Sequence, residues 1–305
     1  MRYKLYLLFL GIIVLAVGLV GGCGMNANTG AYNDYYYPDW TPDGKIICVK
    51  QVSAWEETGS WPAGGSSRRI TSEKYYIVTM DEDGGNETII KQINGVGKVA
   101  ASPLGNYIAY ADNNYLRVIA TSGADVFAID CEMSGYDYDW SNDGNKLIYN
   151  IYDYTNGANN YRTYLINYDG TNKTLIANKA SSPAWRYGDK IIISKPLTTE
   201  AIRIVTINSD TFEENTVYPK VIGGEFNVSP VNNNEVIFRS YGIEKFSLSS
   251  PEAEPILLIN RNDIWNIHLS PDGTKIIGNG TGSGTDFGSE ILKINIDGSG
   301  LIKIK

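Results

Sequence analysis

The sequence has little histidine, little cysteine and no recognisable catalytic motif. Among 305 residues there are three cysteines and a single histidine, His268, which lies directly before the segment Leu269-Ser-Pro-Asp. A zinc site with two or three histidine ligands is excluded, and a Ser-His-Asp hydrolase is difficult to build around this one. The Gly-x-Ser-x-Gly elbow of α/β hydrolases is also missing. We therefore expect a protein that has no enzymatic activity and binds no metal or other cofactor.

Helical periodicity is nearly absent beyond the first 22 residues. The chain is instead rich in tyrosine, of which there are 22, and in isoleucine and valine. These residue types favour β-strands. We expect an all-β protein.

Basic side chains are also scarce, since 26 Lys and Arg stand against 34 Asp and Glu. Removal of residues 1–22 takes away Arg2 and Lys4 and leaves a formal charge of −10. Such a chain repels the phosphate backbone of nucleic acids. Nucleic acid is not an expected partner.

The N-terminus has the layout of a secretory signal peptide. A short basic start precedes an apolar run from Leu5 to Val20 and the small pair Gly21 and Gly22. The run is short for a membrane span. Val20-Gly21-Gly22-Cys23 resembles the lipobox of bacterial lipoproteins, which implies a diacylglyceryl group on Cys23. The alternative is an uncleaved membrane helix beside an incidental cysteine.

In the lipoprotein interpretation, residues 1–22 are a signal peptide and residues 23–34 a lipidated tether. The exported chain is then anchored to the cell membrane or the outer membrane, with its domain outside the cytoplasm.

One phrase recurs along the rest of the chain. It consists of an aromatic or apolar residue, a polar residue, often proline, a turn with Asp or Asn and Gly, and an apolar strand. The copies begin at Trp40, Ala101, Trp140, Trp185, Val228 and Leu269. Apart from the first spacing of 61 residues, the period is close to forty, which is typical of units of four short strands.

Residues 35–305 are therefore predicted to form one six-bladed β-propeller with four-stranded antiparallel blades. The blades are expected at about 35–94, 95–133, 134–179, 180–221, 222–262 and 263–305. In the third blade the strands are expected at 136–140, 146–152, 161–167 and 173–177. Closure of the ring would depend on packing between the first and last blades, and a strand over 32–37 could reinforce it.

The repeated phrase resembles the WSPDG-type repeats of TolB-like β-propellers, which also occur in relatives of prolyl oligopeptidase. The resemblance covers nearly all of the chain after Cys23 and implies the propeller fold. TolB carries an α/β domain ahead of its propeller, for which this chain has no room. The fold shared by the family does not fix a function.

Two carboxylates, Asp39 and Asp139, precede tryptophans at the ends of the expected innermost strands. They could line the central channel and bind a cation or a basic peptide terminus. They could equally accept hydrogen bonds from neighbouring strands, which we favour. His268 is expected in an innermost strand near the channel.

A long insertion over 53–73 explains the first spacing. It contains Trp55, Trp61, Arg68 and Arg69, residue types that are common in binding hot spots. Its alternative interpretation is a disordered or self-packed hairpin extension.

Cys48 and Cys131 are expected in neighbouring units, where a disulfide is conceivable and two buried thiols are favoured.

The leading functional hypothesis is a non-catalytic module that binds a protein or peptide through a propeller face or through the insertion. A glycan-binding propeller is a second hypothesis, motivated by the tyrosines and asparagines of one hairpin loop: Tyr152, Tyr154, Asn159, Asn160 and Tyr161. A metal-dependent lactonase-like or lyase-like enzyme is a third, and would need at least three converging carboxylates or histidines.

Overall fold

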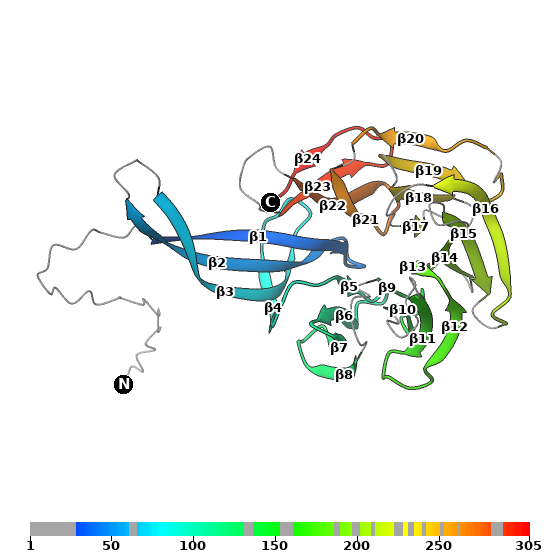
Figure 1. Cartoon of the computed structure of the whole chain (residues 1–305), viewed down its shortest axis with the longest axis horizontal. Coiled ribbons are helices and arrows are strands. Elements are labelled where there is room, and N and C mark those ends of the chain that lie inside the picture. Colours follow the sequence, from blue (N-terminus) through cyan, green and yellow to red (C-terminus); the bar gives the residue numbers. More distant parts are fainter. Residues whose placement is uncertain are drawn as a thin grey trace, which may run out of the picture.

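We analysed a computed structural model of the chain (Figure 1). It describes residues 29–60, 66–130, 137–152, 161–185, 190–196, 202–208, 211–222, 228–230, 235–239, 242–250, 253–261, 263–281 and 289–305. Cys23, Trp61 and Cys131 lie outside these ranges, as does the predicted signal peptide. No helix within the described ranges is long and apolar enough to cross a membrane.

The described residues form six four-stranded antiparallel sheets, each made of consecutive strands. The first contains β1 (Thr29–Trp40), β2 (Ile46–Ser60), β3 (Ser66–Met80) and β4 (Thr88–Ile93). The second contains β5 (Val99–Ala101), β6 (Tyr107–Asp112), β7 (Tyr115–Ala120) and β8 (Asp125–Asp130). The third contains β9 (Tyr138–Trp140), β10 (Lys146–Tyr152), β11 (Tyr161–Asn167) and β12 (Thr174–Asn178).

The later sheets repeat this plan. The fourth contains β13 (Ser181–Trp185), β14 (Lys190–Pro196), β15 (Ile202–Asn208) and β16 (Glu214–Ile222). The fifth contains β17 (Val228–Pro230), β18 (Glu235–Arg239), β19 (Ile243–Ser247) and β20 (Ile256–Ile259). The sixth contains β21 (Ile264–Leu269), β22 (Lys275–Thr281), β23 (Ser289–Asn295) and β24 (Ile302–Lys303).

The first strands of the sheets surround a common centre. β1 contacts β5, β5 contacts β9, β9 contacts β13, β13 contacts β17, β17 contacts β21, and β21 contacts β1. Figure 1 shows the sheets following one another around this centre. The predicted all-β propeller with four-stranded antiparallel blades is confirmed.

The recurring phrase forms the turn between the first and second strands of a blade. In the third blade the Ser141 hydroxyl donates to Asp143 and accepts a hydrogen bond of 2.8 Å from the backbone N–H of Lys146. Gly144 has a φ of 66°, a left-handed conformation that glycine adopts without strain. The sixth blade repeats the arrangement with Ser270, Asp272 and Gly273. The phrase is therefore turn chemistry that directs the chain from one strand into the next.

The ring closes between the first and sixth sheets, because the sixth is built only from β21 to β24. The predicted reinforcing strand over 32–37 lies within β1 and pairs with β2 in the first sheet. β1 also begins at Thr29, inside the segment predicted as a tether. The N-terminal segment therefore extends the first blade and adds no strand to the last, but it contacts β22 and β23 of the last blade and in this way reinforces the closure.

Buried polar groups hold this closure interface. Asn279 of β22 is fully buried; its Oδ1 accepts from the backbone N–H of Tyr37 at 2.8 Å. Its Nδ2 donates to the backbone carbonyl of Tyr35 at 3.0 Å. The bulge in β1 between Tyr36 and Asp39 takes Tyr37 out of the β1–β2 register, and the asparagine supplies a partner for its N–H group.

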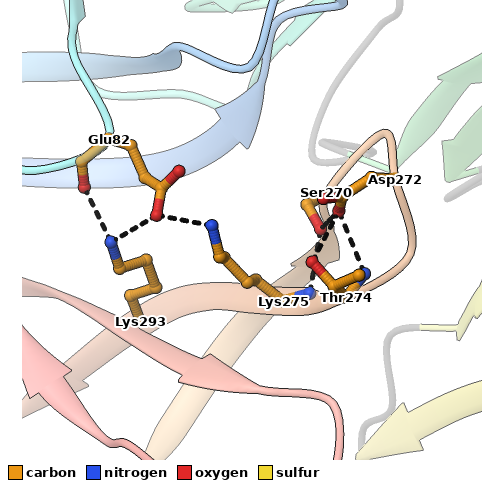
Figure 2. A network of polar contacts seen from close by, with 6 residues as sticks. All are labelled: Glu82, Ser270, Asp272, Thr274, Lys275 and Lys293. Atoms are coloured by element: carbon orange, nitrogen blue, oxygen red, sulfur yellow. Dashed lines mark hydrogen bonds and ion pairs between the residues drawn. The ribbon is translucent and has the colours of Figure 1, made fainter.

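An ion-pair network lies beside this contact. Glu82, which follows β3, accepts hydrogen bonds of 2.7 Å from both Lys275 and Lys293 (Figure 2). The two ammonium groups hold the pKa of Glu82 below its usual value. Apolar side chains of both sheets form one buried cluster beneath: Tyr35, Trp40, Ile46, Cys48, Val78, Met80, Ile277 and Ile291.

The insertion predicted over 53–73 is a hairpin extension and not a separate loop. β2 and β3 remain paired from Ser53↔Glu73 out to Ser60↔Ser66, and β1 pairs with β2 as far as Thr29↔Glu56. β4 pairs with β3 only over Tyr75–Thr79. Residues 29–34, 51–60 and 66–74 thus form a three-stranded projection, which we call the arm, and Figure 1 shows it extending away from the ring.

Candidate functional site

The ends of the innermost strands surround a cavity of about 490 Å³ at one mouth of the channel. Its lining includes Asp39, Lys98, Asp139 and His268, together with prolines of the turns of several blades. The cavity therefore combines acidic, basic and apolar surface in a volume that suits a small ligand or the side chains of a bound peptide.

Asp139 connects two blades through its side chain. Its Oδ1 accepts from the backbone N–H of Trp140, and its Oδ2 accepts from the backbone N–H of Trp185 at the end of β13, both at 2.8 Å. The hydrogen bonds stabilise the ionised form, whereas burial raises the pKa of Asp139 overall. This is the hydrogen-bonding role favoured for the carboxylate from the sequence.

Asp39 occupies the same position in the first blade and has a similar role. Its Oδ1 accepts from the backbone N–H of Trp40 at 2.8 Å, and the backbone N–H of Ala101 in the second blade also donates to the carboxylate. Both aspartates therefore reach from their own blade to the next one along the chain.

His268 occupies the corresponding position in the sixth blade. Its Nδ1 lies 3.3 Å from Oδ1 of Asp39, so this side chain likewise reaches the following blade of the ring. Burial raises the pKa of Asp39 to about 7, and burial with the charge of Lys98 lowers the pKa of His268 to about 3. The pair holds a carboxyl that titrates near neutrality beside an uncharged imidazole.

Lys98 is the cation of the cavity, and the sequence analysis did not identify it. Its Nζ donates to the carbonyl oxygen of Tyr138 at 2.7 Å and lies 5.2 Å from the centre of the tyrosine ring. The Tyr138 hydroxyl donates in return to the backbone carbonyl of Lys98. These contacts fix the ammonium group at the junction of the second and third blades.

A position rule could have found Lys98. It lies three residues before Ala101, the residue aligned with the tryptophans of the phrase, and Asp137 and Ser182 lie three residues before Trp140 and Trp185. All three line the cavity.

Within the described residues no group of three or more His, Cys, Asp or Glu side chains is placed to hold a metal ion. Asp39 and Asp139 accept hydrogen bonds from the scaffold, His268 lies against Asp39, and Lys98 lines the same cavity.

The arm holds the other predicted binding residues. The Arg68 guanidinium lies 4.4 Å from the centre of the Trp55 ring, and Arg69 pairs weakly with Glu56 at 4.0 Å. Trp61 lies outside the described residues. The arm and the cavity lie at opposite ends of β1: Thr29 at its start belongs to the arm, and Trp40 at its end lines the cavity.

Cys48 is a buried free thiol whose pKa is raised by burial. Its predicted counterpart Cys131 is outside the described residues. Of the tyrosines behind the glycan hypothesis, Tyr152 and Tyr161 make an edge-to-face contact of 5.0 Å, and Tyr154, Asn159 and Asn160 are outside the described part.

Comparison with known proteins shows relatives in fold only. No family model and no curated protein sequence matches the chain. A protein assigned as TolB in Agrobacterium tumefaciens matches with a TM-score of 0.56 and 15% identity, over 72% of this chain and 84% of that one.

An oligogalacturonate lyase solved with manganese matches with a TM-score of 0.53 and 15% identity, over 90% of this chain and 78% of that one. The tricorn protease matches with a TM-score of 0.57 and 10% identity, over 93% of this chain but only 36% of that one. The propeller fold thus occurs in TolB and in enzymes, and it does not by itself assign an activity.

Proposed function

We propose that this chain is an exported lipoprotein whose propeller binds a protein or peptide at the channel mouth without catalysing a reaction. The observation that carries the proposal is the cavity of about 490 Å³, which is framed by turns of several blades that hydrogen bonds hold in place. A preorganised rim lowers the entropic cost of binding. Leu104 follows Pro103, which lines the cavity in the equivalent turn of the second blade, and its side chain is 63% exposed, so it offers an apolar contact beside the cavity.

The carboxylates support binding over catalysis. Asp139 uses both oxygens to accept backbone N–H groups, and Asp39 accepts from two backbone N–H groups and lies against His268. Groups that hold adjacent blades together are constrained in position, and they give the cavity a fixed pattern of charge for a partner to match.

Lipid anchoring is the second part of the proposal. It is supported by the basic, apolar and small-residue zones that precede Cys23. A diacylglyceryl group supplies the two chains that stable anchoring needs. The propeller then faces the space outside the cytoplasm, where a protein partner would be met.

Affinity capture from cross-linked native membranes tests the binding proposal. We expect the wild type to capture a specific protein and Leu104→Glu to lose it. Ile256→Glu on the outermost strand β20 is the matched control, since Ile256 is an exposed apolar residue 60% accessible to solvent. A variant in which an Asn-Gly turn replaces 53–73 removes the outer arm, because Val52 and Lys74 pair directly.

The outcomes separate the possibilities. Loss of the partner with the shortened arm alone would place the binding site on the arm and overturn the channel-mouth assignment. If the wild type captures no protein reproducibly, the protein-binding proposal fails, and the glycan hypothesis should be tested on a glycan array.

One observation favours a second candidate function. A carboxyl with a pKa of about 7 beside an imidazole in a cavity is the pattern of a general acid or base. An activity found with the wild type and abolished in a folded Asp39→Asn variant would support an enzyme.

A further inference from the structure

The arm carries an amphipathic face at its tip. Trp55 is paired in register with Gly30 of β1 and Ile70 of β3, so these three residues share one face of the sheet. Tyr32 lies two residues after Gly30 and belongs to the same face. Tyr32 and Ile70 are 42% and 41% exposed, although both are large and apolar in body.

The indole of Trp55 lies flat over the bare backbone of Gly30. A Cβ atom at Gly30 would come within 2.5 Å of the Trp55 ring, so only glycine leaves room for it. The Arg68 guanidinium lies 4.4 Å from the centre of the same ring. The face is therefore preorganised: contacts with Gly30 and Arg68 hold the Trp55 ring in place, and Tyr32 and Ile70 lie on the same face.

The start of the described chain is at the same place. Thr29, the first residue of β1, pairs with Glu56, the neighbour of Trp55. Cys23 precedes Thr29 by six residues, which span at most about 20 Å even when fully extended. A lipid on Cys23 would therefore hold this face within that distance of the bilayer.

The chemistry of the face suits the boundary between lipid and water. Trp and Tyr favour this zone because their rings are apolar and their N–H and O–H groups are polar. Arg places its charged end in the headgroup region while its stem lies on apolar surface. The arm segments contain three basic and four acidic residues, so the arm is close to neutral in a strongly acidic chain and is repelled least by anionic headgroups.

We infer that the arm face formed by Tyr32, Trp55, Arg68 and Ile70 lies on the membrane surface and orients the propeller. The inference depends on the proposed lipidation of Cys23. The acyl chains supply the affinity for the membrane, and the arm face sets the orientation of the propeller relative to the bilayer. Because β1 runs from the arm tip to Asp39 and Trp40, ten residues of strand place the channel mouth about 33 Å along the strand from the bilayer contact. The cavity is thereby presented to partners in solution.

Spin-label depth measurements test this inference on the acylated full-length protein. The protein is reconstituted in vesicles of phosphatidylethanolamine and phosphatidylglycerol, with a label on Ile70→Cys at the arm or on Leu104→Cys at the channel mouth. Both are made in a Cys131→Ser background, and Cys48 is buried. The measured quantity is the ratio of the label's collision rate with oxygen to its collision rate with a water-soluble nickel chelate. We expect this ratio to be several-fold higher for the arm label than for the channel-mouth label.

Two results would overturn the inference. Equal collision ratios at both sites would show that the arm face is in water, and loss of nickel collisions without a gain in oxygen collisions would show that a protein or a second copy covers it. A Tyr32→Ser, Trp55→Ser double variant provides the second readout: it should move the arm label into water while acylation is unchanged, and an unmoved label would contradict the role of the face.

Failure of the proposed anchor is detected separately. Mass spectrometry of the same sample reports whether Cys23 carries the diacylglyceryl group. An unmodified cysteine refutes the anchor, whereas a modified cysteine with an aqueous arm label refutes only the arm contact.

Discussion

The Asp39–His268 pair illustrates how two half-buried residues can make the stability of the fold depend on pH in opposite directions. Asp39 has a folded-state pKa of about 7, above its unfolded value, so its burial costs more stability as the pH rises from about 4 to about 7. His268 has a folded-state pKa of about 3, below its unfolded value, so its burial costs stability at low pH and the cost vanishes as the pH rises past about 6.5.

Single substitutions should separate these two effects. The slope of the unfolding free energy against pH is compared with that of the wild type between pH values of about 4 and 6.5. Asp39→Asn should make this slope more positive, and His268→Asn should make it more negative, each by up to ~1 kcal/mol per pH unit. Denaturant unfolding at several pH values measures both. Asp125→Asn, on an exposed carboxylate, is the control. Slopes equal to that of the wild type in this pH window would contradict the account and would mean that Asp39 and His268 form an ion pair, because an ion-paired carboxyl titrates below a pH of about 4 and an ion-paired imidazole above about 6.5.

Equivalent tryptophans differ in a way that a substitution can detect. Trp140 donates its indole N–H to the carbonyl oxygen of Ala100 at 3.2 Å, whereas the indole N–H of Trp40 is buried with no hydrogen-bond partner among the described residues. Trp140→Phe should therefore destabilise the fold more than Trp40→Phe, by ~1 kcal/mol beyond the cavity cost that both share. Equal losses in thermal unfolding would show that the Trp40 N–H is satisfied.

At the scale of elements, the sequence predicts the regular blades well and the irregular ones poorly. The expected strands of the third blade at 146–152 and 161–167 coincide with β10 and β11. Alternating side chains and Asp-Gly turns specify such strands locally. The insertion over 53–73 has the same β-forming residues, but its pairing with β1 depends on a long-range register that composition does not reveal.

Only some of the cavity-lining residues could be predicted, because the others depend on long-range contacts. Asp39 and Asp139 stand out beside tryptophans, and the structure places both at the cavity. Lys98 has no such neighbour, since Ala101 replaces the tryptophan in its blade. The contact between His268 and Asp39 joins residues 229 positions apart, and only the closed ring brings them together.

The closure interface supplies a test at this scale. Asn279→Ala would remove the side chain that bonds both the N–H of Tyr37 and the carbonyl of Tyr35 across the interface, and we expect a loss of ~2–4 kcal/mol in the free energy of unfolding. Asn167→Ala, which removes an exposed turn contact, should cost far less. If the two variants lose equal stability, Asn279 does not hold the ring closed.

At the scale of the whole molecule, the anchor and the propeller can be separated. Cys23→Ser should prevent diacylglyceryl transfer and move the protein from the detergent phase to the aqueous phase in a phase-partition assay. Cys48→Ser, at a buried thiol in the first blade, should leave partitioning unchanged. Equal partitioning of Cys23→Ser and wild type would show that Cys23 is not the membrane anchor.

Site-specific photo-cross-linking in living cells most directly tests the claim that the channel mouth binds a protein. A photoreactive amino acid at Leu104, on the rim, is compared with one at Ile256, on an outermost strand of the fifth blade, both exposed in the free protein. We expect a discrete cross-linked protein from position 104 and none from position 256. Absence of a product at position 104, or the same products from both positions, would contradict the assignment of the channel mouth as the binding site.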